Sequence, residues 1–149
     1  MNEHKEAWFE TWFDSSYYYK LYRHRNINEA GPFLKNLVRF LDIRPDQLIL
    51  DLACGRGRHA ILLNQMGMNV IGIDLSEKNI DYARQYENDR LHFYVHDMRN
   101  EFEKGPFDFV LNFFTSFGYF DTREENEKVV RNVSDSLKKN GKFLLDFLN

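Results

Sequence analysis

Short apolar runs alternate with longer amphipathic stretches from Gln47 onward, and this alternation constrains the fold more than any other feature. The apolar runs have the length of strands, and the longer stretches space their apolar residues as helices do. The expected strands are Ile49–Leu52, Asn69–Ile73, Leu91–Val95, Phe107–Phe114 and Lys142–Leu148. The expected helices are Arg58–Met66, a stretch from a Ser76 cap to about Asn88, and Glu124–Lys139, which Gly141 would cap. Strands that alternate with helices predict an α/β fold with a doubly wound, mostly parallel sheet of about five strands and flanking helices.

The first forty-five residues differ from the rest, because they are aromatic and contain no strand pattern. Two segments, Asn2–Phe13 and Asn28–Asp42, are expected to be helical. The chain of 149 residues has the length of one domain. We therefore expect a single domain, with residues 1–45 as an N-terminal helical lid and residues 46–149 as a ligand-binding α/β core.

Charge and cysteine content narrow the partners and the compartment. Twenty Lys and Arg against 23 Asp and Glu give a net charge of -3, which offers no broad electrostatic footprint for nucleic acid. The one cysteine cannot form an internal disulfide or a Cys-rich zinc site, which fits a reducing cytoplasm. No uncharged apolar run reaches the roughly 18–20 residues that cross a bilayer. We therefore expect a cytoplasmic protein that binds neither nucleic acid nor membrane nor a metal.

The stretch Ile49–Ala60, ILDLACGRGRHA, carries the most chemical information. A strand ends next to an acidic residue, a turn with Gly55 and Gly57 follows, and a helix begins beyond it. The glycines allow a close approach to the backbone that a Cβ would obstruct. The helix N-terminus offers backbone N–H groups to a polar ligand.

Two more acidic residues follow strands. Asp74 stands at the end of the second strand, where an acidic side chain can accept both hydroxyls of a ribose. Asp97 occupies the equivalent place after the third strand. Together with Asp51, these carboxylates are expected along the sheet edge at which open α/β folds bind ligands.

The spacing Gly55-x-Gly57-x-x-Ala60 also fits the dinucleotide fingerprint, so a NAD-dependent oxidoreductase is one alternative. Two features favour another ligand. Four residues, Asp51 to Cys54, intervene where the fingerprint glycine normally follows the strand directly. A carboxylate at Asp51 would also lie near the phosphate position, and it suits a ligand with a positive amine or sulfonium instead.

The segment from Ile49 to Asn149 resembles the class I S-adenosylmethionine-dependent methyltransferases, which have a Rossmann-like sheet. The resemblance rests on five motifs in the expected order: DLACGRGRHA, GIDLSEKNIDYAR, HDMR, FDFVLNFFTSFGYF and GKFLLDFLN. The N-terminal WFDSSYYYKLYRHRNINEA is similar to the lead-in of one bacterial branch whose substrates are mostly unassigned. Ala53 departs from the family, many members of which have a glycine there. The family also usually continues through a sixth and a seventh strand, whereas this sequence ends after the fifth.

The resemblance implies S-adenosyl-L-methionine as the cofactor. Carried over by position, the cofactor-binding residues are Asp51, Ala53, Gly55, Gly57, Asp74, Leu75, Asp97, Met98 and Asn112. The first strand and its turn would hold the methionine part, Asp74 the ribose, and Leu75 and the HDMR turn the adenine. Asn112 would lie near the methionyl group and the substrate. Tyr18, Tyr19 or Arg25 would close over the cofactor from the lid, and the sequence does not decide which.

The implied reaction is methyl transfer to a small-molecule acceptor by in-line displacement, with no general base identifiable in the sequence. A further alternative is a non-catalytic or incomplete cofactor-binding core, because the sequence ends early. The last strand would present an open apolar edge made of Phe143, Leu144, Leu145, Phe147 and Leu148. We expect this edge to pair with a second copy, as a homodimer.

Overall fold

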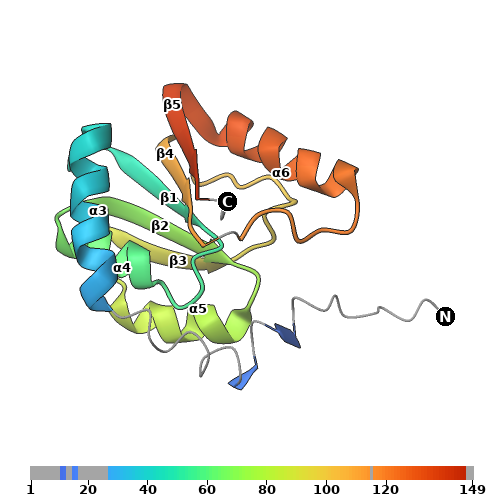
Figure 1. Cartoon of the computed structure of the whole chain (residues 1–149), viewed down its shortest axis with the longest axis horizontal. Coiled ribbons are helices and arrows are strands. Elements are labelled where there is room, and N and C mark those ends of the chain that lie inside the picture. Colours follow the sequence, from blue (N-terminus) through green and yellow to red (C-terminus); the bar gives the residue numbers. More distant parts are fainter. Residues whose placement is uncertain (1–10, 13–14, 17–26, 115, 147–149) are drawn as a thin grey trace.

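A five-stranded sheet lies between helices in the computed structural model, which describes residues 11–12, 15–16, 27–114 and 116–146 (Figure 1). The strands are β1 Leu48–Leu52, β2 Asn69–Asp74, β3 Leu91–Val95, β4 Phe107–Asn112 and β5 Leu137–Leu145. Their order across the sheet is β3-β2-β1-β4-β5, and all four neighbouring pairs are parallel. The predicted doubly wound α/β fold is confirmed. Because every strand runs in the same direction, all their carboxyl ends meet at one edge.

The helices are α3 Ile27–Leu41, α4 Arg58–Gln65, α5 Glu77–Ala83, the short 3₁₀ helix η1 Arg84–Tyr86, and α6 Arg123–Ser136. The expected helix Asn28–Asp42 is confirmed as α3. The expected helix Asn2–Phe13 lies outside the described residues, apart from residues 11 and 12, which are helical. None of the helices in the described part of the chain has the length and apolar character needed to cross a membrane.

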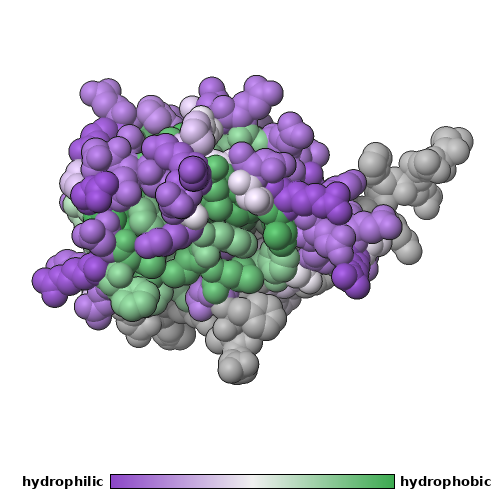
Figure 2. Space-filling view, turned by 90° about the horizontal axis from the view of Figure 1, so that it is seen from above, coloured by the Kyte–Doolittle hydropathy of each residue, from purple (hydrophilic) through white to green (hydrophobic). Residues whose placement is uncertain are grey.

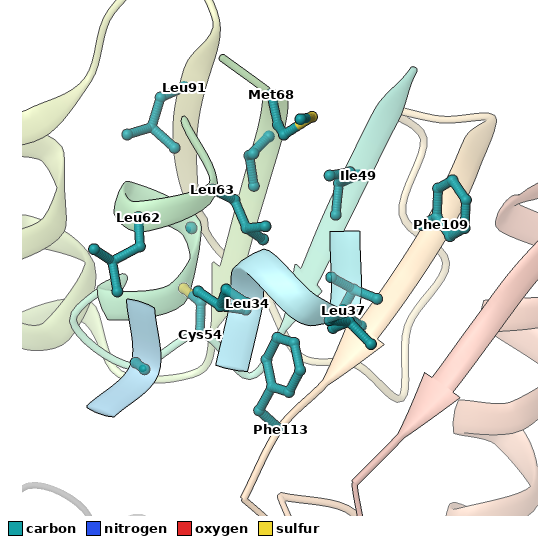
Figure 3. Packing of buried hydrophobic residues seen from close by; sticks show 14 of the residues in the cluster. Leu34, Leu37, Ile49, Cys54, Leu62, Leu63, Met68, Leu91, Phe109 and Phe113 are labelled. Carbon is teal, nitrogen blue, oxygen red and sulfur yellow. The ribbon is translucent and has the colours of Figure 1, made fainter. Parts of the chain in front are cut away.

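Alternation along the strands sends side chains to two separate cores. Ile49, Val70 and Phe109 face one side, where α3 and α4 cover them (Figure 3). Their neighbours Leu50 and Ile71 face the other side, where α6 packs. Burial on both faces explains why the three central strands β1, β2 and β4 are nearly continuous apolar runs. Leu34 of α3 and Leu63 of α4 are fully buried in the first core, so α3 is part of the packed domain.

Helix α6 covers the second face with a narrower stripe than its sequence suggests. It begins with a capping box, in which Thr122 accepts from Glu125 N–H and Glu125 accepts from Thr122 N–H. Val129 and Val133 are buried against the sheet. The helical spacing of Val129, Val130, Val133 and Leu137 predicts one buried face, but Val130 is 47% exposed, and Leu137 packs against this core from β5 rather than from the helix.

The junction between α6 and β5 also corrects the expected helix end. Helix α6 stops at Ser136, and Gly141 lies within β5 rather than capping a helix. Phe107 pairs with Leu137 and Phe109 with Lys142, so the intervening residues of β5 form an irregular bulge. A Cβ on Gly141 would come within 2.9 Å of the Lys138 carbonyl oxygen. The glycine therefore permits a close backbone approach inside the bulge.

Strand β4 is shorter than expected and ends at Asn112. Phe114 has a φ of 57°, a left-handed conformation that strands do not adopt. Helix α5 likewise ends at Ala83 and continues as η1, short of the expected Asn88.

Candidate functional site at the carboxyl edge of the sheet

The turn after β1 occupies the centre of the carboxyl edge. Ala53 has a φ of 59° and Gly55 a φ of 56°, both in the left-handed region. A Cβ on Gly55 would meet no atom of the described residues within 4 Å, so among them open space lies beside this residue. At Gly57 a Cβ would lie 2.6 Å from the Phe93 ring. Gly55 therefore faces a ligand-accessible space, whereas Gly57 lets α4 pack closely on β3.

Asp51 lies in β1, one residue before its end, and is only 1% exposed. It accepts a hydrogen bond from the backbone N–H of Ala60, in the first turn of α4. Its Oδ2 is buried and has no hydrogen-bond partner among the described residues. Burial raises the pKa of Asp51 to about 7, and the charge of Asp74 acts in the same direction, against the Ala60 hydrogen bond and Arg58. A buried acceptor of this kind is stabilised by a cationic hydrogen-bond donor.

Asp74 ends β2, beside the same turn. Its Oδ2 accepts from Gly55 N–H at 2.8 Å, and its Oδ1 accepts from Ser76 N–H at 2.9 Å. The Ser76 side chain in turn caps α5 by accepting from Asn79 N–H at 3.2 Å. Asp74 is thus held by backbone donors on two sides, one of them in the glycine turn after β1. Leu75, the next residue, is 39% exposed.

Asp97 follows β3 and has a different environment, because a cation engages it. Arg99 donates to it from the backbone N–H at 2.9 Å, from Nε at 3.1 Å to each oxygen, and from Nη2 at 2.6 Å. Burial alone would raise the pKa of Asp97, but the hydrogen bonds and charge of Arg99 outweigh it and lower this pKa. Met98, between them, is partly buried, and its carbonyl accepts from Asn132 Nδ2 at 3.1 Å.

Asn112 ends β4 and is fully buried. Its Nδ2 donates to the Leu52 carbonyl of the neighbouring strand at 2.9 Å. Its Oδ1 has no hydrogen-bond partner among the described residues. Asn112 therefore offers a second buried acceptor at the carboxyl edge. The lid residues of the prediction, Tyr18, Tyr19 and Arg25, lie outside the described residues.

This geometry agrees with the comparison to known families. The model of a family described as a methyltransferase domain matches residues 49–141, which include all but the first residue of β1, the glycine turn and all three carboxylates. The chain belongs to this methyltransferase family.

Individual relatives are similar over shorter or longer parts of this methyltransferase domain. The putative methyltransferase YqeM of Bacillus subtilis is 37% identical over 102 residues, which are 66% of this chain and 41% of that protein. A dTDP-3-amino-3,4,6-trideoxy-α-D-glucopyranose N,N-dimethyltransferase of Streptomyces venezuelae is 33% identical over 94 residues, 62% of this chain and 39% of that protein. The chain thus spans less than half the length of these two relatives.

A solved structure extends the likeness to the fold. The structure of CalS10, an amino pentose methyltransferase from Micromonospora echinaspora bound to S-adenosylmethionine, is 27% identical with a TM-score of 0.68. The match covers 87% of this chain and 55% of that protein.

Several residues at the edge of this methyltransferase domain were missed by the sequence reasoning. Arg99 was read only as part of HDMR, and neither Glu125 nor Asn132 was singled out. Arg99 lies in the turn after β3 and donates to Glu125, and Asn132 donates to the Met98 carbonyl of the same turn. Glu125 and Asn132 belong to α6, far from this turn in the sequence. A capping-box pattern at Thr122 and Glu125 was the available signal, and it points to a helix start rather than to a ligand.

His59 of the methyltransferase domain, in the first turn of α4, packs on the aromatic residues that follow β4. Its ring lies 4.6 Å from that of Phe113 and 5.1 Å from that of Phe114. Burial, with a smaller contribution from the charge of Arg58, lowers the pKa of His59 to about 3. The imidazole is therefore neutral at pH 7 and adds no positive charge to this edge.

Proposed function

We propose that this chain binds S-adenosyl-L-methionine and transfers its methyl group to a small-molecule acceptor. The observation that carries the proposal is the Oδ2 of Asp51, a buried carboxylate oxygen without a hydrogen-bond partner among the described residues. It lies in β1 immediately before the turn in which Gly55 borders open space. A buried carboxylate beside a vacant backbone surface fits a ligand that carries an ammonium group.

The remaining carboxylates support the two other parts of such a cofactor. Asp74, oriented by the N–H groups of Gly55 and Ser76, is suited to hold the two ribose hydroxyls. Leu75, which is 39% exposed, provides apolar surface next to it for the adenine. Asp97 would accept from the adenine amino group, and the Met98 N–H would donate to a ring nitrogen.

The charge pattern of the site also argues against a dinucleotide. A pyrophosphate at the glycine turn would bring negative charge next to Asp51 and Asp74, which already raise one another's energy in their charged forms. A cation at the same place reduces that repulsion. The methyltransferase function is therefore favoured over the NAD-dependent alternative.

Methyl transfer requires the protein mainly to align the cofactor with the acceptor. The bound cofactor supplies an activated methyl group on a sulfonium. The chain's own residues bind and orient, through Asp51, Asp74 and the turn between them, and exclude water with aromatic side chains such as Phe113. No residue is assigned as a general base. Asn112, with its buried Oδ1, would orient a polar group near the transferred methyl.

A small-molecule acceptor is supported by the relatives and by the charge. The Streptomyces venezuelae relative is a methyltransferase of a nucleotide-linked amino sugar, and CalS10 is an amino pentose methyltransferase. The net charge of -3 offers no general attraction to nucleic acid. We propose a small polar acceptor, and a cytoplasmic location consistent with the cofactor.

Ligand binding tests this function. S-adenosylhomocysteine should bind in isothermal titration calorimetry and raise the melting temperature by mass action, whereas NADH should do neither. Asp108→Asn is the matched control for replacing an aspartate of the site, and it should leave binding unchanged. Asp108 pairs with Lys138 at the opposite edge of the sheet. Binding of NADH without binding of S-adenosylhomocysteine would contradict the proposal.

We also propose that the edge of β5 pairs with a second copy of the chain. Strand β5 is the last strand of the described sheet, and Leu145 on it is 39% exposed. Figure 2 shows an apolar surface between the sides of the molecule on which α3 and α6 lie, in the view from above. An uncovered strand with apolar side chains favours pairing with another strand.

Light scattering at micromolar concentration measures this association. We expect a dimer for the unaltered chain and a monomer for Leu145→Lys. Val130→Lys, an equally charged change on the exposed side of α6, should leave the dimer intact. A monomer for the unaltered chain would remove the edge of β5 as a self-association surface.

A further inference from the structure

The turn after β3 is fastened to α6 by side chains that the cofactor contacts proposed above do not include. Arg99 Nη1 donates to Glu125 Oε1 at 2.7 Å while the rest of its guanidinium engages Asp97. Asn132 Nδ2, two turns further along α6, donates to the Met98 carbonyl at 3.1 Å. Both sides of the turn that carries Asp97 and Met98 are thus held by one helix.

The hydrogen bonds from Arg99 leave the Asp97 carboxylate able to accept one more hydrogen bond from a ligand. An ionised carboxylate offers about four acceptor sites. Arg99 brings three hydrogens to it: its backbone N–H, its Nε–H, which is shared between both oxygens at 3.1 Å, and one on Nη2. Because the Nε–H divides its bond between the two oxygens, it saturates neither, so the carboxylate can accept one further hydrogen from a ligand, and its plane is fixed by the bidentate fork.

The other end of the guanidinium is anchored equally well. Glu125 Oε2 accepts from the Thr122 hydroxyl at 3.1 Å and from Thr122 N–H at 3.3 Å, as part of the cap of α6. The Arg99 guanidinium also lies over the ring of Phe120, 4.7 Å from its centre. Arg99 is 28% exposed and Asp97 19%, so solvent screens this pair only partly.

We propose that Arg99 is a positioning residue for adenine recognition: it orients the Asp97 carboxylate so that its remaining acceptor site selects a ring bearing an amino group. This inference rests on the proposed cofactor function and deepens it. Arg99 does not touch the ligand. It acts by pre-organising an acceptor that would otherwise rotate. Its hydrogen bond to Glu125 fixes the turn that carries Asp97 relative to α6.

Two ligands that differ at one group make the role measurable. S-adenosylhomocysteine has the 6-amino group, and S-inosylhomocysteine has a carbonyl oxygen there, which would face the carboxylate acceptor to acceptor. Calorimetry on the unaltered full chain should give at least about tenfold tighter binding of the amino ligand. Arg99→Ala should reduce this preference to about threefold or less, mainly by weakening S-adenosylhomocysteine.

Two further variants separate positioning from charge and from stability. Arg99→Lys keeps the positive charge without the planar fork, so it should restore little of the preference. Arg123→Ala removes the same charge from an arginine that is 91% exposed and pairs with Glu127, so it should leave the preference unchanged. Thermal unfolding followed by circular dichroism establishes that each variant is folded at the titration temperature.

The outcomes divide clearly. Loss of the preference in Arg99→Ala and Arg99→Lys, but not in Arg123→Ala, supports the positioning role. An equal loss of affinity for both ligands in Arg99→Ala, with the preference intact, would overturn it and leave the proposed function standing. Binding of neither ligand to the unaltered chain would overturn both.

Discussion

The two halves of the carboxyl edge use the same residue type in opposite ways. Near the end of β1, Asp51 is buried, its Oδ2 has no partner among the described residues, and burial raises its pKa to about 7. After β3, Asp97 has a lowered pKa, because the hydrogen bonds and charge of Arg99 outweigh the effect of burial. Both are aspartates close to the carboxyl end of a strand in a parallel sheet.

The difference shows that position at a strand end does not fix the chemistry of a carboxylate. A buried carboxylate that accepts only a backbone N–H has a negative charge without a cationic partner, and a cationic ligand can stabilise it. A carboxylate held by a guanidinium has its charge neutralised within the protein and contributes orientation instead. The β1–β2 half should therefore contribute most of the binding energy, and the β3–α6 half should contribute selectivity.

The largest effect is expected at Asp51. Asp51→Asn removes the buried charge that would meet the cofactor's ammonium group, so the affinity for S-adenosylhomocysteine should fall on the order of 100-fold, or about 3 kcal/mol. The unliganded protein should become more stable at pH 8, by about 1–3 kcal/mol in urea unfolding, because an uncompensated buried carboxylate is gone.

Asp108→Asn provides the contrast for this prediction. Asp108 is paired with Lys138 at 2.8 Å, so its replacement should leave the affinity unchanged and should not increase stability. A loss of stability in Asp51→Asn together with unchanged affinity would show that Oδ2 meets no ligand.

Asp74→Ala should have the second-largest effect. Its carboxylate would hold two ribose hydroxyls, and its removal should weaken S-adenosylhomocysteine by at least about tenfold, or 1.5–3 kcal/mol. Stability should fall as well, because the N–H groups of Gly55 and Ser76 lose their acceptor. Asp74→Asn, which retains one side-chain acceptor, should recover part of both. An unchanged dissociation constant for Asp74→Ala would remove this residue from the site.

The pH dependence of stability should separate Asp51 from His59. Asp51 has a pKa raised from 3.8 to about 7, so the folded state binds more protons and the stability it contributes is lost as pH rises from about 4 to 7. His59 has a pKa lowered from 6.5 to about 3, so its contribution is lost as pH falls below 6.5. The two opposing slopes should nearly cancel between pH 4 and 6.5.

Urea titrations across this range measure the cancellation. The stability of Asp51→Asn should rise with pH between 4 and 6.5, because the Asp51 slope that opposes His59 is gone, whereas the unaltered chain should change little. Parallel curves for the two proteins would contradict the raised pKa of Asp51. Affinity for S-adenosylhomocysteine should increase from pH 6 to 8 in the unaltered chain only, since binding favours the ionised carboxylate.

The smallest effect is expected at Ala53, where the family often has glycine. The φ of 59° imposes strain on an alanine Cβ, so Ala53→Gly should stabilise the fold by about 1 kcal/mol or less, after the entropy of the unfolded glycine is subtracted. Ala30→Gly, in the buried face of α3, should instead destabilise it by about 1 kcal/mol. Thermal melts compare the two. Destabilisation by Ala53→Gly would mean that the turn tolerates alanine without strain.

Much of the fold was readable because its signals are local. The five strands came from apolar runs, and Leu91–Val95 was placed at its observed bounds. The start of α4 at Arg58 and the Ser76 cap of α5 were likewise visible, since a turn and a capping hydroxyl act within a few residues. The end of α6 could not be predicted in this way, because a glycine such as Gly141 is a good helix cap by itself, and it favours a helix that continues to Lys139. In the structure, pairing of Leu137 and Lys142 with β4 takes precedence over that local preference.

The sequence by itself determined which carboxylates stand at the sheet edge, because a parallel α/β pattern brings every strand end to the same side. It also determined the position of the glycine turn after the first strand. Only the tertiary structure decided how those carboxylates differ. Asp51 and Asp97 have similar local contexts, but a pKa depends on burial and on charges brought close in space. The contacts of Arg99 with Glu125 and of Asn132 with Met98 join residues 26 and 34 positions apart, and no periodic pattern encodes them.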